Sequence, residues 1–202
     1  GCAKVECPTE PVTPGQGEEP AAPMEPELTP EEIAEQERLA AEKAREERLQ
    51  GLLNSMTLEE KVGQLFFVRC PETNAVEDIS TYHLGGYLLF GRDFKDKTAQ
   101  QVRDDIQSYQ DASGIPLLIG TDEEGGTVVR ASSNPDLFPQ REPAPQTLFA
   151  QGGMDLILQD ARQKSMTLLD LGVNVNFAPV AAVSTDPADD IDARCLGHVA
   201  QA

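Results

Sequence analysis

Aromatic and basic residues are scarce in this chain of 202 residues. There is no tryptophan, aromatic residues make up 5% of the sequence, and 16 lysines and arginines stand against 35 aspartates and glutamates. The formal net charge of −19 argues against a nucleic-acid or anionic membrane partner, because both need a basic surface on the protein. No apolar run approaches the roughly 18 residues of a membrane-spanning helix.

Cysteine is also infrequent, and its spacing carries no metal signature. The sequence has no Cys-x-x-Cys pair and no histidine at zinc-ligand spacing from a cysteine, so we predict no metal and no cofactor. A disulfide between Cys70 and Cys195 suits an exported protein, but small buried thiols are the commoner outcome. The acidic stretch 184–192 lacks the spacing and central glycine of a calcium-binding EF-hand, which favours a solvated loop.

Cys2 stands near the first residue and precedes a stretch rich in proline and glutamate. This arrangement resembles a mature bacterial lipoprotein, in which a lipid on the cysteine anchors a flexible tether. The resemblance implies a protein held at the bacterial cell surface or in the periplasm, touching the membrane only through Cys2. A plain cysteine near a disordered terminus is the alternative.

The first 55 residues contain too few clustered apolar side chains to build a core. Residues 1–28 are predicted to form a disordered, lipoprotein-like tether. From Thr29 the pattern Thr-Pro-Glu-Glu favours helix initiation, and strong helix formers follow. Since the apolar stripe is thin and sustained heptads are missing, we expect residues 29–55 to be an exposed helical spacer.

Residues 56–202 show a different rhythm, in which short apolar runs alternate with longer amphipathic stretches. This alternation is typical of a parallel sheet built from βα units. The predicted strands are 64–68, 86–90, 116–120 and 173–180, and the predicted helices are 98–112 and 153–170. In the fourth run, Asn174 and Asn176 alternate with apolar residues and are expected on the opposite face.

Charged residues follow the first three apolar runs directly: Arg69, then Arg92 and Asp93, then Asp122, Glu123 and Glu124. In a (β/α)8 barrel the carboxyl ends of the strands form one face, and that face holds the active site. These side chains therefore have a functional interpretation, although acids in a solvated loop would give the same pattern.

Five blocks together resemble the N-terminal barrel domain of glycoside hydrolase family 3, closest to its bacterial β-N-acetylhexosaminidase branch. They are MTLEEKVGQLFFV, LGGYLLFGRDF, IPLLIGTDEEGGTVVR, FP at 138–139 and LGVNVNFAPVAAV, and the match extends over roughly residues 52–197. The resemblance implies an α/β fold, a partial (β/α)8 TIM barrel of about the first four βα units, behind the tether and the spacer.

The resemblance also assigns sugar-binding roles. The family motif Asp-Gln-Glu-Gly-Gly-Arg-Val-x-Arg aligns its aspartate with Asp122 and its last arginine with Arg130, and a later Arg-Ser-Phe-Gly element aligns with Arg194. A carboxylate accepts hydrogen bonds from sugar hydroxyls and a guanidinium donates to others. Gly125 and Gly126 are expected to leave room for the ligand beside the backbone.

Departures from the family pattern are clear. Ala182 replaces an aspartate, Thr127 an arginine and Glu123 a glutamine, and the Lys-His-Phe-Pro-Gly-His-Gly segment does not occur in the sequence. We therefore expect no catalytic residue in this chain. The family hydrolyses terminal β-linked N-acetylhexosamines or β-glucosides with retention, so the implied partner is a β-linked amino sugar or other glycan. The expected role is sugar binding within a longer enzyme, and the alternative is a non-catalytic surface lipoprotein that binds or scaffolds glycans.

Overall fold

The computed structural model describes residues 28–184, 186 and 188–196. Residues 1–27 of the predicted tether, including the proposed anchor at Cys2, lie outside these residues. The chain divides into two units, residues 1–50 and 51–202. The division into tether, spacer and barrel remains a prediction.

Helix α1 spans Pro30–Ser55 and buries none of its residues. Its start has a reciprocal cap, in which the Glu32 amide donates to Thr29 Oγ1 over 3.3 Å and the Thr29 amide donates to Glu32 Oε2 over 2.8 Å. Arg38 pairs with Glu35 at 2.7 Å and with Glu42 at 3.4 Å along the exposed surface. Helix propensity and such pairs, rather than a packed face, therefore support α1.

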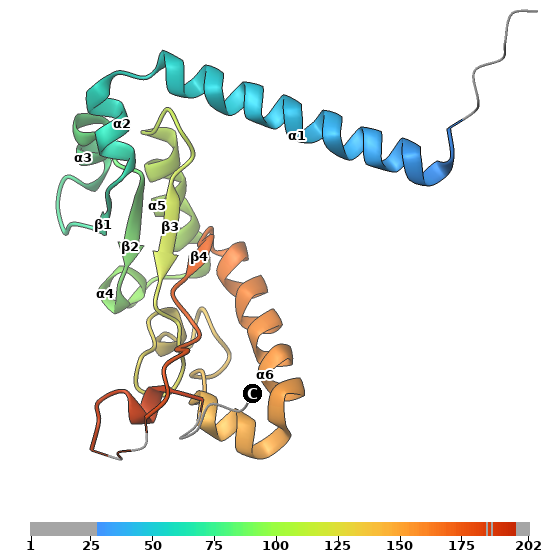
Figure 1. Ribbon diagram of the computed structural model, residues 1–202. Helices are drawn as coiled ribbons and strands as arrows, with labels where there is room; N and C mark the ends of the chain where they lie inside the picture. Colours follow the sequence, from blue (N-terminus) through green and yellow to red (C-terminus); the bar gives the residue numbers. More distant parts are fainter. Residues whose placement is uncertain (1–27, 185, 187, 197–202) are drawn as a thin grey trace, which may run out of the picture. The chain divides into compact units, whose positions relative to one another are not determined.

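The second unit is built on a sheet of four parallel strands in the order β1-β2-β3-β4 (Figure 1). The strands are β1 (Phe67–Arg69), β2 (Gly86–Leu89), β3 (Leu118–Thr121) and β4 (Val175–Asn176). Each strand pairs with the next one along the chain, which is the winding of a (β/α) barrel. The predicted α/β class and parallel sheet are confirmed, and within the described residues the sheet is open.

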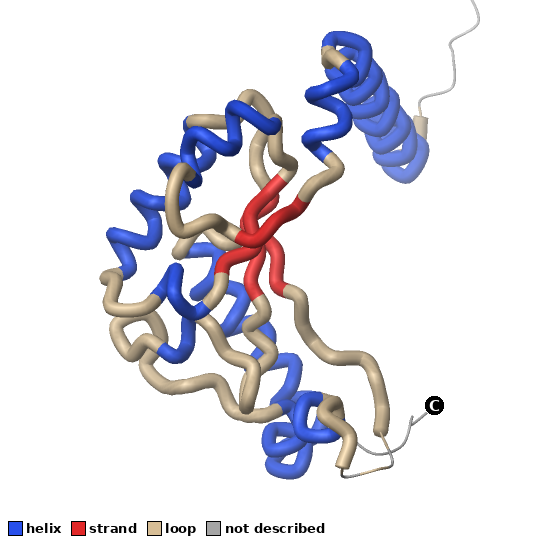
Figure 2. The backbone as a smooth tube through the Cα atoms, turned by 90° about the vertical axis from the view of Figure 1, so that its left-hand side faces the viewer, coloured by secondary structure: helices blue, strands red, loops and turns tan. Residues whose placement is uncertain are grey.

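One face of the sheet is buried beneath helices. Side chains alternate along each strand, so Tyr87, Leu89 and Ile119 point to one side and are fully or almost fully buried. The helices of this unit are α2 (Leu58–Gln64), α3 (Ala75–Tyr82), α4 (Gly91–Phe94), α5 (Ala99–Asp111) and α6 (Pro145–Asp170). Figure 2 shows that the helices connecting the strands gather on one side of the sheet. Val102, Ile106 and Leu168 carry the apolar contacts from α5 and α6 into this core.

The opposite face carries an aromatic contact between residues of the first and fourth strand regions. The rings of Phe67 and Phe177 lie 5.3 Å apart. Gly86 and Gly120 make the hollow for Phe67, because a Cβ at either position would collide with its ring. Leu118 and Phe177 on this face remain about half exposed. This is the face that points inward in a closed barrel.

Several element boundaries differ from the sequence prediction. The first strand begins at Phe67 instead of residue 64, because α2, which is capped at Thr57, continues to Gln64. Helix α6 begins at Pro145, eight residues earlier than predicted, and is interrupted at Gly152 and Gly153, whose φ/ψ angles are not helical. The fourth strand is limited to two residues.

Because β4 is short, the expected alternation over 173–177 fails. Val173 is buried in the core, whereas Phe177 lies on the opposite face. The side chains of Asn174 and Asn176 bond to the backbone of the neighbouring strand region. The Asn174 amide group accepts from the Ile119 amide and donates to the Leu117 carbonyl. The Asn176 amide group accepts from the Glu123 amide and donates to the Glu123 carbonyl. These amide side chains fasten β4 to β3 beyond the short ladder. No helix in the described part of the chain is both long and apolar enough to cross a membrane.

Candidate sugar-binding site

The structure brings Asp122 and Arg130 together at the carboxyl end of β3. Arg130 Nη2 donates to Asp122 Oδ2 over 3.0 Å, and each side chain keeps 23% of its surface exposed. Asp122 Oδ1 has no hydrogen-bond partner among the described residues. The pair therefore presents both a free acceptor and an accessible guanidinium, and these are the groups that bind vicinal hydroxyls.

Glu123, the next residue, is buried completely and serves the loop itself. Its Oε2 accepts backbone amides from Arg130, Ala131 and Ser132 over 2.9, 2.7 and 3.2 Å. Its Oε1 accepts the Ser132 hydroxyl over 2.6 Å. The carboxylate thus caps the 3-10 helix η1 (Ala131–Ser133) and fixes the backbone of Arg130. The sequence did not predict this role, and no local pattern distinguishes Glu123 from its acidic neighbours.

Gly125 and Gly126 adopt positive φ angles of 98° and 64°. A Cβ on Gly125 would collide with the carbonyl oxygen of Pro143, and one on Gly126 would lie 2.9 Å from Ala144 Cβ. The Gly126 amide also donates to the Glu142 carbonyl over 3.0 Å. The prediction that these glycines leave room for a ligand is therefore wrong: the space belongs to residues 142–144 of the protein.

Arg194, the third predicted site residue, forms a two-pronged ion pair with Glu124. Its Nε and Nη2 donate to the two carboxylate oxygens over 2.9 and 2.7 Å, and Glu124 is buried. Hydrogen bonding to Glu124 raises the pKa of the Arg194 guanidinium. The contact connects residue 194 to the loop after β3 across 70 positions of sequence. Arg194 remains one-third exposed, so the pair positions it at the same edge of the sheet as Asp122.

The ring of Phe90, which follows β2, is close to the guanidinium groups of two arginines. The guanidinium carbon of Arg69 lies 4.6 Å from the ring centroid and that of Arg130 lies 5.1 Å from it. Both distances are within the range of cation–π attraction. The side chains after β1, β2 and β3 are thus in one connected group.

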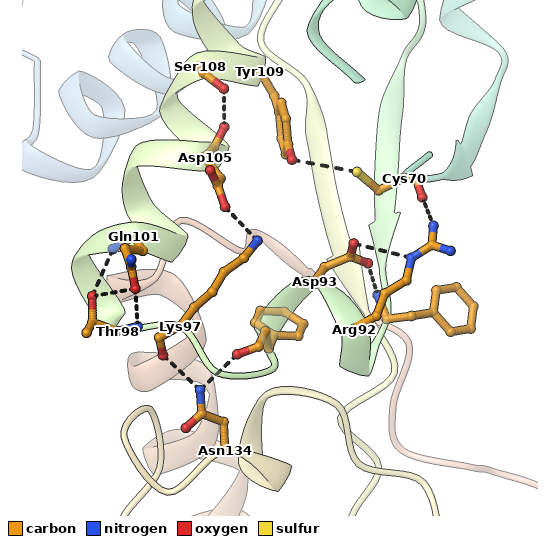
Figure 3. A network of polar contacts seen from close by, with 12 residues as sticks. Cys70, Arg92, Asp93, Lys97, Thr98, Gln101, Asp105, Ser108, Tyr109 and Asn134 are labelled. Atoms are coloured by element: carbon orange, nitrogen blue, oxygen red, sulfur yellow. Dashed lines mark hydrogen bonds and ion pairs between the residues drawn. The ribbon is translucent and has the colours of Figure 1, made fainter. Parts of the chain in front are cut away.

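Arg92 and Asp93, by contrast, are engaged in internal contacts (Figure 3). Arg92 Nη1 pairs with Glu72 at 2.5 Å, and Nη2 donates to the Cys70 carbonyl. Asp93 Oδ2 accepts the Phe90 amide over 2.7 Å and so caps the short helix α4. These two charges support the loop after β2 and are not available as ligand groups.

Behind the loop after β3, a buried cluster joins α6 to residues 142–144. Lys164 Nζ lies 3.0 Å from Asp160 Oδ2 and 3.5 Å from Glu142 Oε2, and Lys164 and Glu142 are more than nine-tenths buried. The pKa of Glu142 is raised to about 7, mainly by burial and to a smaller extent by a hydrogen bond with Asp160. The Glu142 amide donates to Ser132 Oγ over 3.1 Å. A cavity of about 320 Å³ adjoins this cluster and reaches Glu124.

Cys70 and Cys195, the cysteines in the part of the chain that the structure describes, form no disulfide with each other. Cys70 Sγ lies 3.8 Å from the Tyr109 hydroxyl, and Cys195 Sγ donates to the Asp192 carbonyl over 3.2 Å. Burial raises the pKa of the Cys70 thiol to about 11, which leaves it protonated and unreactive at neutral pH. Among the residues that the structure describes, no group of three or more side chains is arranged to hold a metal ion.

A family model, described as the glycosyl hydrolase family 3 N-terminal domain, matches residues 57–201. Two curated relatives illustrate the similarity. Beta-hexosaminidase from Haemophilus influenzae (strain PittEE) is 30% identical over 109 residues, which are 54% of this chain and 31% of that protein. Beta-hexosaminidase LpqI from Mycobacterium tuberculosis is 30% identical over 135 residues, 65% of this chain and 33% of that protein. The chain thus spans about a third of the length of these relatives.

Solved structures agree with the sequence matches. A glycosyl hydrolase of the same family from Mycobacterium smegmatis superposes with a TM-score of 0.60 at 26% identity, over 71% of this chain and 42% of that one. A family 3 beta-N-acetylglucosaminidase from Paenibacillus gives a TM-score of 0.60 at 28% identity, over 71% of this chain and 28% of that one. The four-stranded open sheet therefore corresponds to part of the barrel-type domain in these enzymes.

Proposed function

Because the chain belongs to glycoside hydrolase family 3, through its N-terminal domain, we propose that it supplies the sugar-holding part of an enzyme that releases terminal β-linked N-acetylhexosamines. Within that enzyme, Asp122, Arg130 and Arg194 bind the hydroxyls of the terminal sugar. The observation that carries this proposal is the accessible Asp122–Arg130 pair at the carboxyl edge of a parallel sheet.

The chemistry of the pair suits a neutral, hydroxyl-rich ligand. The Asp122–Arg130 ion pair places a carboxylate acceptor and a guanidinium donor side by side at the site. A sugar that inserts its hydroxyls next to them is held by charge-assisted hydrogen bonds from a carboxylate acceptor and a guanidinium donor. Glu123 fixes the backbone of Arg130 beforehand, which lowers the entropy lost on binding.

The bond-breaking groups are proposed to lie outside this chain. In the retaining mechanism, a carboxylate attacks the anomeric carbon while an acid protonates the leaving oxygen, and the resulting glycosyl ester is hydrolysed by water that the same acid/base residue deprotonates. Glu123 and Glu124 do not perform these steps, because one caps the loop backbone and the other pairs with Arg194. The contribution of residues 120–130 is to hold the sugar in place during both steps.

The proposal is tested by titrating the 202-residue chain with N-acetylglucosamine and following amide shifts by NMR. We expect binding that is lost in Asp122→Ala, and shifts concentrated at residues 120–132. The control Asp104→Ala removes a carboxylate from the exposed surface of α5 and retains binding. Shifts that are absent, or that persist unchanged in Asp122→Ala, would contradict the proposal.

Activity separates sugar holding from catalysis. The purified 202-residue chain is expected to show no turnover of an aryl N-acetyl-β-glucosaminide, and measurable turnover would disprove the assignment of the bond-breaking groups to other segments. Binding without turnover also fits the alternative of a non-catalytic glycan-binding protein.

Lipid attachment at Cys2, and with it a location at the bacterial cell surface or in the periplasm, is a separate proposal that mass spectrometry of the native N-terminus tests.

A further inference from the structure

Arg69, the last residue of β1, is an exposed cation to which no role has been assigned above. In the sheet register Arg69 aligns with Leu88 of β2, and Leu89 aligns with Thr121, the residue before Asp122. Arg69 thus ends its strand at the same edge of the sheet as Asp122. Its side chain is exposed, whereas the other two residues of β1 are partly buried.

The contacts with the Phe90 ring limit how far apart the Arg69 and Arg130 guanidinium groups lie. Both guanidinium carbons lie about 5 Å from the centroid of this ring, so they are at most about 10 Å apart. A sugar held by Asp122 and Arg130 therefore has Arg69 within reach of a substituent. The ring also holds both guanidinium groups by cation–π attraction, which orders two side chains that are otherwise long and mobile.

Charge balance distinguishes Arg69 from its neighbours. Several cations near this edge have a carboxylate within 4 Å, among them Arg92 with Glu72, Lys97 with Asp105, Arg130 with Asp122, Lys164 with Asp160, and Arg194 with Glu124. Arg69 has no hydrogen bond and no ion pair with any residue that the structure describes. Arg69 therefore differs from Arg130, the other arginine on the Phe90 ring, which is paired with Asp122.

From this geometry we infer that Arg69 is a specificity residue, which binds an anionic substituent, a carboxylate or a phosphate, on the sugar held by Asp122 and Arg130. The inference rests on the proposed sugar-binding role of that pair and adds the class of sugar. A guanidinium presents a planar fork of donors that matches the oxygens of either anion, and Arg69 has all of its donors available for the ligand.

Three monosaccharides test the inference on the 202-residue chain by NMR titration. N-acetylglucosamine is neutral, N-acetylmuramic acid adds a carboxylate, and N-acetylglucosamine 6-phosphate adds a phosphate. We expect at least one anionic sugar to bind about tenfold more tightly than N-acetylglucosamine, as one charge-assisted contact would give. The preferred sugar identifies the anion, and the preference should shrink as sodium chloride is raised from 20 to 500 mM.

The decisive readout is the ratio of the neutral to the anionic dissociation constant in each variant. In Arg69→Gln the ratio should fall to about one. Arg69→Lys should give an intermediate ratio, because lysine keeps the positive charge but lacks the planar set of guanidinium donors. Arg162→Gln, which removes the same charge from the exposed surface of α6, should keep the wild-type ratio.

The outcomes separate the two proposals. Equal binding of all three sugars to the wild type, or a wild-type ratio in Arg69→Gln, would overturn the role of Arg69 while leaving Asp122 and Arg130 as a sugar-binding pair. If none of the three sugars binds, the proposed function itself fails, and the inference about Arg69 fails with it.

Discussion

The loops after β2 and β3 are both rich in charge, yet they use it differently. After β2, Arg92 and Asp93 both bond within the protein, to nearby backbone groups and to Glu72. After β3, Glu123 likewise bonds to backbone amides of the protein, but Asp122 and Arg130 remain partly exposed beside it. Charge at a strand end can thus either stabilise the loop itself, as Asp93 and Glu123 do, or remain partly exposed, as Asp122 does.

The largest expected effect comes from removing that support. Glu123→Ala deletes the acceptor of three backbone amides and one hydroxyl in a fully buried position, so it should cost at least about 3 kcal/mol of unfolding free energy. Urea denaturation followed by circular dichroism measures this loss. Asp122→Asn is the matched neighbour, and a similar loss in that variant would erase the difference between the two acids.

The loop after β2 should lose less when its own buried anchor is removed. Asn134 Nδ2 donates to the carbonyl oxygens of Phe94 and Lys97, both over 2.8 Å (Figure 3). Asn134→Ala leaves these acceptors unsatisfied and is expected to cost about 1–3 kcal/mol, measured by the same denaturation. Sugar binding at Asp122 should persist in folded protein. Loss of binding at temperatures where the variant is folded would show that the two loops are coupled.

Glu142 should make stability depend on pH. Its pKa rises to about 7 in the folded protein, above the value of about 4.3 expected in an unfolded chain. The folded state therefore binds more protons than the unfolded state between these values, so stability falls as pH increases from about 4.5 to 7, by roughly 1–3 kcal/mol. Glu142→Gln should flatten this part of the profile. An unchanged slope in the variant would assign the pH dependence to another group.

The smallest expected effect on stability is at the exposed pair. Asp122→Asn should change the unfolding free energy by less than about 1 kcal/mol, because a partly exposed ion pair contributes little. The same change should weaken N-acetylglucosamine binding about tenfold or more, because hydroxyl donors then meet an uncharged acceptor. Denaturation and NMR titration of one sample measure both. A large loss of stability in Asp122→Asn with unchanged sugar binding would contradict the proposal that Asp122 binds the sugar while Glu123 stabilises the loop.

Much of the fold was predictable because the signals are local. Apolar runs mark the cores of the four strands, and capping boxes mark the starts of α2 and α5. The juxtaposition of Asp122 and Arg130 also followed from a motif of nine residues. Their role in binding remains a prediction.

What the sequence missed depends on long-range contacts. The pairing of Glu124 with Arg194 joins positions 70 residues apart, and the backbone of residues 142–144 fills the space at Gly125 and Gly126. Neither contact has a periodic or spacing signal. The same holds for Glu123, whose burial distinguishes it from Asp122 although the two residues are adjacent.

The ring of Phe67 has a consequence for how this family member can vary. It occupies the hollow that Gly86 and Gly120 leave on neighbouring strands. A Cβ at Gly120 would collide with the ring of Phe67, so a side chain added there requires a smaller residue at position 67. A Cβ at Gly86 would also collide with the backbone carbonyl oxygen of Leu118, which a smaller residue at position 67 does not relieve. In homologous chains position 86 should therefore remain glycine, whereas positions 67 and 120 should covary in size.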